Sequence, residues 1–244
     1  MDLFMAEENT QAAEMVNGLI KRSQHAQAIL STFTQEQVDK ICEAIAKAGK
    51  EHAQELAQAA VQETRRGVVA DKVTKNIFAS ECIWESLKDV KTVGVVSEDE
   101  DKGLVSIAEP MGVIAGVTPV TNPTSTVIFK SMIALKTRNT IVFGFHPQAQ
   151  KSCVMAGKLV EAAAEAAGAP KDSILWIEEP SLEATTALMH NPNVSLILAT
   201  GGPSMVSAAY SSGKPALGVG PGNGPAYVAE SANVTKAIDD IVTS

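Results

Sequence analysis

The first ninety residues show the pattern of polar and apolar positions that is typical of helices. The segment Thr34-Gln35-Glu36-Gln37 has the spacing of a helix-capping box. Behind it, apolar residues recur every three or four positions, at Val38, Ile41, Ile45 and Ala48. Gly49 and Gly67 interrupt the pattern and indicate helix ends or turns. We therefore expect a helical region over residues 1–90 that packs on the rest of the chain.

A change to β-type patterning follows. Residues 92–96 (TVGVV) and 104–108 (LVSIA) are rich in β-branched residues, and the acidic segment SEDEDKG separates them. This arrangement predicts a two-stranded β-ribbon over residues 91–109 that projects from the body of the protein.

From residue 110 onward, short apolar runs alternate with helical stretches. The runs predict strands at 112–118, 140–145, 174–179, 195–200, 216–220 and 226–230. The stretches between them predict helices at 123–137, 147–167, 181–189 and 203–211, with a closing helix from about residue 234. Uniformly apolar strands that alternate with helices indicate an α/β fold, with a Rossmann-like parallel sheet and helices on both faces. We expect this α/β domain to cover residues 110–244 and to bind its ligands beyond the carboxyl ends of the strands.

The composition and charge of the chain exclude several kinds of partner and site. The chain has 244 residues, a net charge of −8 and 45% hydrophobic residues, which is ordinary globular usage. The acidic balance argues against a nucleic acid or an anionic membrane as the main partner. Neither a secretory signal nor a membrane-spanning run is visible, and the three cysteines include no CxxC pair. We expect a cytoplasmic protein with no metal site, in which the cysteines are structural.

Three strand ends carry candidate ligand-binding residues. Asn122 lies between two prolines in the segment 118–123, where its amide either stabilises an oxyanion or belongs to a turn. His146 either binds a ribose or phosphate, or caps the next helix. The run Thr200-Gly201-Gly202-Pro203 places glycines directly before a helix start, as in an anion or nucleotide site.

Two further motifs leave alternatives open. The loop 218–225 (GVGPGNGP) does not satisfy the dinucleotide fingerprint G-x-G-x-x-G, so it is either an extended surface for a flat ligand or a linker. The pair Arg65-Arg66 either interacts with the dipole of a helix C-terminus or has a ligand role, and we favour the dipole.

Five segments together resemble the aldehyde dehydrogenase superfamily, from about residue 30 to the end. They are ETRRGVVADKVTKN (63–76), AEPMGVIAGVTPVTNPTST (108–126), FHP (145–147), LILATGGP (196–203) and GKPALGVGPGN (213–223). Within the superfamily the chain is similar to the CoA-acylating branch, in particular to the acetaldehyde dehydrogenase part of bacterial bifunctional aldehyde–alcohol dehydrogenases. Arg65 departs from the small residue or glycine that is usual in this family.

The resemblance implies site residues position by position. The loop that lines the NAD site corresponds to Val117, Thr118, Pro119, Val120 and Thr121. Asn122 corresponds to the catalytic amide that holds the oxyanion, and also lies at the cofactor. His146 and Pro147 correspond to the stretch near the adenosine ribose, and Gly202 and Gly220 to glycines beside the cofactor.

The resemblance also implies an activity. Hydrolytic members carry a glutamate in the loop that is here 217–222, where this chain has no carboxylate. This favours transfer of the acyl group to a thiol such as coenzyme A over hydrolysis. The implied reaction converts a small aldehyde, acetaldehyde, with CoA and NAD to acetyl-CoA and NADH, and it runs in reverse in fermentation. A succinate-semialdehyde-type acylating dehydrogenase is one alternative, and a non-catalytic nucleotide-binding or assembly module is another.

The nucleophilic cysteine of the family lies in a motif soon after the closing helix, and the chain ends at Ser244, before that motif. We therefore expect the catalytic cysteine domain to be missing and this chain to be inactive alone. The resemblance further implies a homo-oligomer assembled through the ribbon 91–109, and a filament in the full-length bifunctional enzyme.

Overall fold

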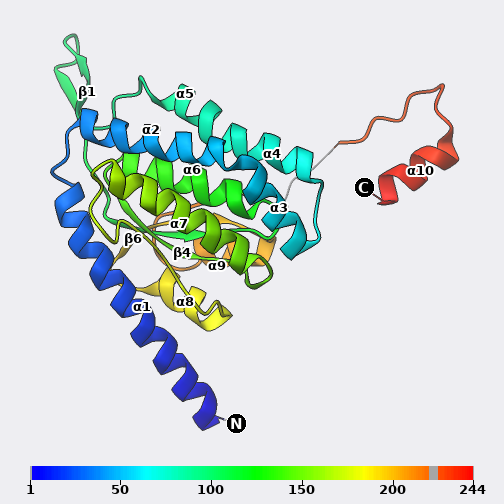
Figure 1. Ribbon diagram of the computed structural model, residues 1–244, viewed down its shortest axis with the longest axis horizontal. Coiled ribbons are helices and arrows are strands. Elements are labelled where there is room, and N and C mark those ends of the chain that lie inside the picture. Colours follow the sequence, from blue (N-terminus) through cyan, green and yellow to red (C-terminus); the bar gives the residue numbers. More distant parts are fainter. Residues whose placement is uncertain (1, 220–224, 244) are drawn as a thin grey trace.

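The computed structural model describes residues 2–219 and 225–243 and contains a five-stranded parallel sheet with helices on both faces (Figure 1). The sheet runs in the order β5-β4-β3-β6-β7. Its strands are β3 (Val113–Val117), β4 (Thr140–Gly144), β5 (Ile174–Trp176), β6 (Val194–Thr200) and β7 (Ala216–Val219). The expected α/β class with a parallel sheet is confirmed.

The strand order reverses once, between β3 and β6. From β3 the chain moves outward through β4 to β5, then returns to the other side of β3 and continues through β6 to β7. Val117 at the end of β3 pairs with Gly144 on one side and Ala199 on the other. The loops that follow β3 and β6 therefore leave in opposite directions, which opens a crevice between them.

Successive side chains of the strands enter two separate cores. Ile141 and Phe143 of β4 pack with α2 (Gln35–Glu51), α6 (Pro123–Lys136) and α7 (Gln150–Ala166). Val142, which lies between them, faces the opposite core with the side chains of α1 (Asp2–Leu30) and α8 (Leu182–His190). The remaining helix of the sheet is α9 (Pro203–Tyr210), which contacts β6 and β7. Every residue of β3, β4 and β5 is buried, which is why these strands read as continuous apolar runs.

The N-terminal helices continue as α3 (Ala53–Thr64), α4 (Val69–Ile77), the π-helical turn η1 (Phe78–Cys82) and α5 (Ile83–Leu87). The capping box at the start of α2 is present in both directions between Thr34 and Gln37. Gly67 lies in the turn between α3 and α4 with a φ of +73°, as expected of a turn glycine. The helix end indicated by Gly49 lies two residues further on, because α2 ends at Glu51. An added Cβ at Gly49 would be 3.0 Å from the Ser80 side chain and 3.1 Å from that of Ile128, so the neighbouring side chains pack closely against this glycine.

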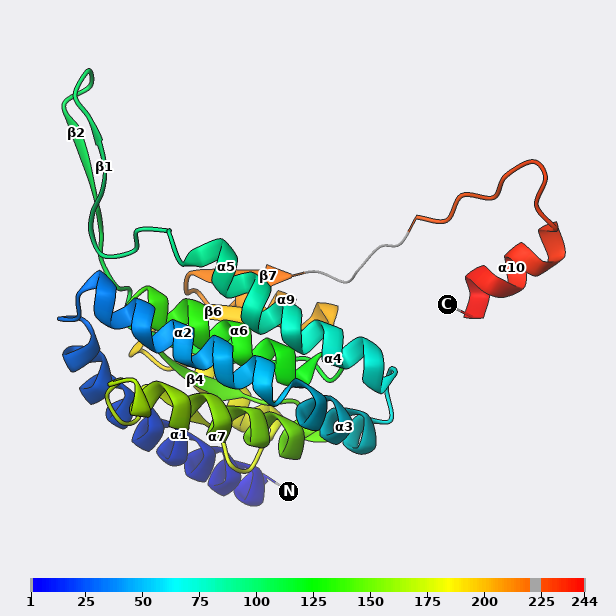
Figure 2. The same cartoon turned by 45° about the horizontal axis from the view of Figure 1, so that its top comes forward.

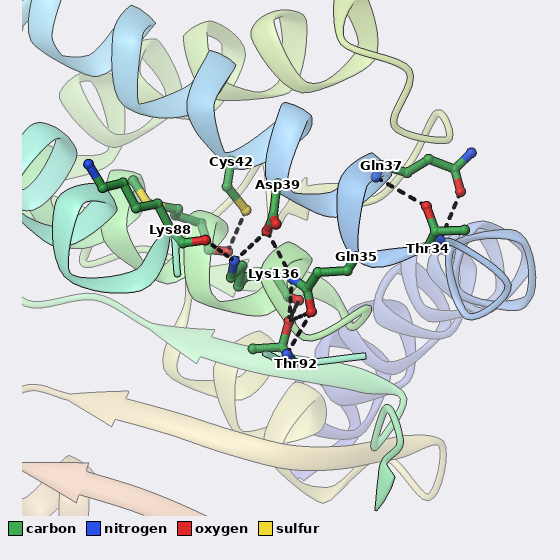
Figure 3. A network of polar contacts seen from close by, with 9 residues as sticks. Thr34, Gln35, Gln37, Asp39, Cys42, Lys88, Thr92 and Lys136 are labelled. Atoms are coloured by element: carbon green, nitrogen blue, oxygen red, sulfur yellow. Dashed lines mark hydrogen bonds and ion pairs between the residues drawn. The ribbon is translucent and has the colours of Figure 1, made fainter. Parts of the chain in front are cut away.

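A buried lysine joins the helical region to the sheet domain. Figure 3 shows Lys136 of α6 between Asp39 of α2, with which it forms an ion pair, and the backbone carbonyl of Lys88. The Lys136 carbonyl in turn accepts a 2.6 Å hydrogen bond from the hydroxyl of Thr92, and the Thr92 backbone N–H donates to Gln35 of α2. This network fixes the start of the ribbon segment against both α2 and α6.

The ribbon consists of β1 (Gly94–Asp99) and β2 (Leu104–Ala108), which pair antiparallel and project away from the sheet (Figure 2). At the other end of the chain, α10 (Val234–Thr243) stands apart from the sheet. The strand expected at 226–230 is wrong. These residues are exposed, with Tyr227 at 90%, and within the described part of the chain no strand lies beside them to pair their backbone groups. The strand expected at 174–179 ends earlier, at Trp176.

Replacing Phe143 by alanine should strongly destabilise the fold. Its ring is fully buried and stacks on Phe145 with 5.4 Å between the ring centroids. The cavity left by Phe143→Ala should lower the free energy of unfolding by about 3–5 kcal/mol in urea denaturation. Leu104→Ala, at a ribbon position that is 59% exposed, is the control and should change it by less than about 0.5 kcal/mol. Equal effects of the two substitutions would contradict the assignment of the core.

Candidate functional site

A cleft of about 620 Å³ lies at the point where the strand order reverses. The loops after β3, β4 and β6 contribute to it, together with the last residue of β7. Its lining residues are Pro119, Val120, Thr121, Asn122, Thr126, His146, Thr200, Gly201, Gly202 and Val219. Six of the residues implied by the family resemblance therefore meet in one cleft, together with the candidates Thr200 and Gly201, although they come from three separate segments of the chain.

The other predicted residues lie elsewhere. Val117 and Thr118 are buried beneath the loop, at 4% and 2% exposure, and support the cleft without lining it. Pro147 lines a neighbouring hollow. Gly220 lies outside the described residues.

Lys130 of α6 forms hydrogen bonds with both strands that flank the crevice, β3 and β6. Its side chain is 2% exposed, and its ammonium donates to the carbonyl oxygens of Val117 at 2.7 Å and Leu198 at 2.6 Å and to the hydroxyl of Thr200 at 3.0 Å. Thr200 also donates to the Val117 carbonyl at 3.0 Å. Burial lowers the pKa of Lys130 to about 7. Nothing in the sequence marks this residue, because a lysine in a helix is usually exposed.

Two lysines of α4 hold the loop that follows β3. Lys72 is buried and donates to the carbonyl of Thr121 at 2.7 Å, and burial, together with the charge of Lys75, lowers its pKa. Lys75 donates to the amide oxygen of Asn122 at 3.1 Å. Because an ammonium engages that oxygen, it also determines which end of the amide is the NH₂ donor. The Asn122 nitrogen lies 3.4 Å from the hydroxyl of Thr121, and Asn122 itself is half-buried and lines the cleft.

His146 caps a short helix and also lines the cleft. Its Nδ1 accepts a hydrogen bond from the backbone N–H of Gln148 at 3.1 Å and so caps the short helix η2 (Pro147–Ala149). The ring also lines the cleft. Burial and the neighbouring charge of Arg66 lower its pKa, so the ring is neutral at pH 7.

None of the cysteines is an activated thiol at the cleft. Burial raises the pKa of Cys42 and of Cys153 to about 12. Cys82 is exposed in η1 and does not line the cleft. Cys153 lies close to the end of β3. Its sulfur lies 3.7 Å from the hydroxyl of Thr118, directly behind β3.

The described residues contain no cluster of three or more histidine, cysteine or acidic side chains that could hold a metal ion. Over the same residues, no helix has the length and hydropathy needed to cross a membrane.

The contribution of Lys130 to stability should rise with pH. Its folded pKa of about 7 lies below its ordinary value of 10.5, so between these values the unfolded chain binds a proton that the folded chain has released. Raising the pH then favours the folded state. In urea denaturation at pH 7.5–9.5, the free energy of unfolding of the unmodified chain should rise relative to Lys130→Met, by at most about 1.4 kcal/mol per pH unit. Parallel pH profiles would contradict this.

Comparisons with known proteins agree with this architecture. The sequence profile of the aldehyde dehydrogenase family matches residues 4–244. The bifunctional aldehyde-alcohol dehydrogenase of Escherichia coli K12 is 54% identical over 235 residues, which cover 96% of this chain and 26% of that protein. The chain therefore spans about a quarter of the length of that curated relative.

Two solved structures are also similar. An acetylating aldehyde dehydrogenase from Geobacillus thermoglucosidasius superposes with a TM-score of 0.88 at 50% identity, covering 97% of this chain and 52% of that one. A propionaldehyde dehydrogenase from Rhodopseudomonas palustris, solved with CoA bound and an acylated cysteine, has a TM-score of 0.78 at 33% identity, covering 93% of this chain and 52% of that one. Family profile, relatives and structures agree, and the chain belongs to the aldehyde dehydrogenase family.

Proposed function

We propose that this chain forms the cofactor side of a CoA-acylating acetaldehyde dehydrogenase, which interconverts acetaldehyde, CoA and NAD with acetyl-CoA and NADH. The observation that carries the proposal is the cleft at the strand-order reversal, where the 119–122 loop faces Gly201 and Gly202. The Geobacillus structure is an acetylating aldehyde dehydrogenase and the R. palustris structure holds CoA beside an acylated cysteine, which supports the same reaction class.

NAD is proposed to lie in this cleft, where it would accept a hydride from the substrate. Gly202 precedes α9, whose N-terminus faces the cleft and favours an anionic group such as a pyrophosphate. A Cβ added at Gly202 would meet no atom within 4 Å, so a ligand has room to approach the backbone there. His146 and Pro147 lie at the end of β4, on the side proposed for the adenosine ribose.

Asn122 is proposed as the amide that donates to the oxyanion formed when a thiol adds to the aldehyde. Such a donor is effective only when its orientation is fixed before the reaction. The contact between Lys75 and the Asn122 amide oxygen supplies that orientation. The lining of the cleft among the described residues includes no aspartate or glutamate, so no carboxylate there would activate water. This supports transfer of the acyl group to the thiol of CoA.

The ribbon is proposed as an oligomerisation arm, with residues 1–90 as the helical region and residues 110–244 as the cofactor domain. The ribbon exposes several apolar side chains, which are Val95, Leu104, Val105 and Ile107. Exposed apolar residues on a projecting strand pair are typical of an interface.

A side chain at Gly202 should block NAD binding without affecting the fold. The leucine of Gly202→Leu would occupy the cleft, since no protein atom lies in its way. Gly18→Leu, at an exposed position of α1 that is equally free of neighbours, is the matched control. Isothermal titration with NAD should detect binding for the unmodified chain and Gly18→Leu, and none for Gly202→Leu. Unchanged NAD binding in Gly202→Leu, or no binding by the unmodified chain, would contradict the proposal.

The chain by itself should bind NAD without oxidising acetaldehyde. Two of its thiols are buried and protonated at neutral pH, and the third does not line the cleft. NADH absorbance should therefore stay flat when acetaldehyde and CoA are added to the NAD-loaded chain, with the E. coli relative as positive control. Turnover that disappears in Cys82→Ala would contradict this expectation and assign the nucleophile to Cys82.

A further inference from the structure

A second hollow adjoins the cofactor cleft. It has a volume of about 510 Å³ and lies between the C-terminus of α3 and the loop after β4. Its lining residues are Glu63, Thr64, Arg65, Arg66, Pro147 and Gln148. His146 of the cleft and Pro147 of the hollow are consecutive residues, so the two spaces share one wall.

The two arginines of the hollow have no protein partner. Among the described residues, neither the Arg65 nor the Arg66 guanidinium forms an ion pair or a side-chain hydrogen bond, and both residues are exposed. The other arginines are engaged: Arg22 pairs with Asp172 at 2.6 Å, and Arg138 donates to the carbonyls of Ser31 and Ala108. In a chain of net charge −8, two adjacent free guanidiniums in a hollow form a local anion site.

The carboxylate of the hollow is already occupied. Both oxygens of Glu63 accept backbone hydrogen bonds at the start of α7, from Lys151 at 2.8 Å and Ser152 at 2.7 Å. Its charge is therefore directed at the helix N-terminus and away from the open space. Among the lining groups of the hollow that remain free to bind a ligand, the two guanidiniums carry the charge.

The loop after β4 also lacks the acid that recognises an unmodified ribose. In dinucleotide-binding sheets, a carboxylate near the end of the second strand binds the ribose hydroxyls, whereas an arginine in that region accommodates a ribose phosphate. Here the residues after β4 are Phe145, His146 and Pro147, and Arg65 and Arg66 lie beside them. The charge of Arg66 reaches His146, because it contributes to the lowered pKa of that ring.

We propose that this hollow binds the phosphate monoester on the adenosine ribose of a coenzyme, with Arg65 and Arg66 as its ligands. Two coenzymes carry this group, CoA as a 3′-phosphate and NADP as a 2′-phosphate. The inference rests on the proposed function, because the adenosine must first lie at the end of β4. It adds a recognition element that distinguishes phosphorylated from unphosphorylated adenosine.

Two matched ligand pairs test the phosphate directly. Isothermal titration of the chain with CoA against dephospho-CoA, and with NADP against NAD, varies only the ribose phosphate within each pair. For at least one pair, the phosphorylated ligand should bind roughly tenfold or more tightly, which is the usual effect of a charge-assisted contact. A preference in the CoA pair alone assigns the hollow to the 3′-phosphate, and one in the NADP pair alone to the 2′-phosphate.

The variant Arg65→Gln/Arg66→Gln should remove that preference and leave the binding of dephospho-CoA and NAD unchanged. The control Lys21→Gln/Lys91→Gln removes the same charge from exposed positions that do not line the hollow, and it should keep the preference. Retained binding of the unphosphorylated ligands shows that the arginine variant is folded.

The outcomes separate the two proposals. If NAD and dephospho-CoA bind but neither pair shows a preference, the phosphate site is wrong and the proposed function stands. If the arginine and lysine variants lose the preference equally, the effect is one of net charge and the site is also wrong. If none of the four ligands binds, the proposed function fails and the phosphate site fails with it.

Discussion

The ammonium of Lys130 holds the sheet together at the place where its strand order reverses. A crevice opens there because the connections after β3 and β6 leave in opposite directions, and the carbonyls of Val117 and Leu198 lie at its base. A buried amino group is tolerated only when it is hydrogen-bonded, and the Lys130 nitrogen contacts two carbonyls and the hydroxyl of Thr200. Lys130 lies two turns into α6, and helical side chains tilt toward the helix N-terminus. The helix that begins at the cleft therefore also supplies the group that fixes its base.

Lysine side chains also hold the loop that lines the cleft. Lys72 holds the carbonyl of Thr121, and Lys75 holds the amide oxygen of Asn122. Together with Lys130, these cations contact the 117–122 segment from two different helices, α4 and α6. The loop is thus fixed by charge-assisted contacts at its backbone carbonyls and at the Asn122 amide. A fixed loop is what the proposed oxyanion role of Asn122 requires.

Much of the fold follows from local pattern. The capping box at Thr34, the uniformly apolar strands and the two β-branched segments of the ribbon each correspond to an observed element. The features that local pattern did not predict have a common cause. The stretch 226–230 has strand-like composition but no neighbouring strand to pair with. In the sequence, Gly49 indicates a helix end. In the structure, the side chains of Ser80 and Ile128 also pack closely against it. Cys153 lies beside Thr118 because of tertiary packing, which the sequence of one helix does not specify.

By itself, the sequence determined the class of fold, the family resemblance and most of the residues that line the cleft. The cleft residues could be found because the ligand loops of a parallel sheet follow the ends of its strands, and the strands were recognisable in the sequence. Only the tertiary structure decided which charges act at the site. Lys72, Lys75 and Lys130 look like ordinary helical lysines in the sequence, and Arg65 and Arg66 look like a helix terminus. Their roles depend on what lies within about 3 Å of each cation. Three lysines meet oxygen acceptors that come from residues 13 to 70 positions away, whereas the two arginines meet no protein partner among the described residues.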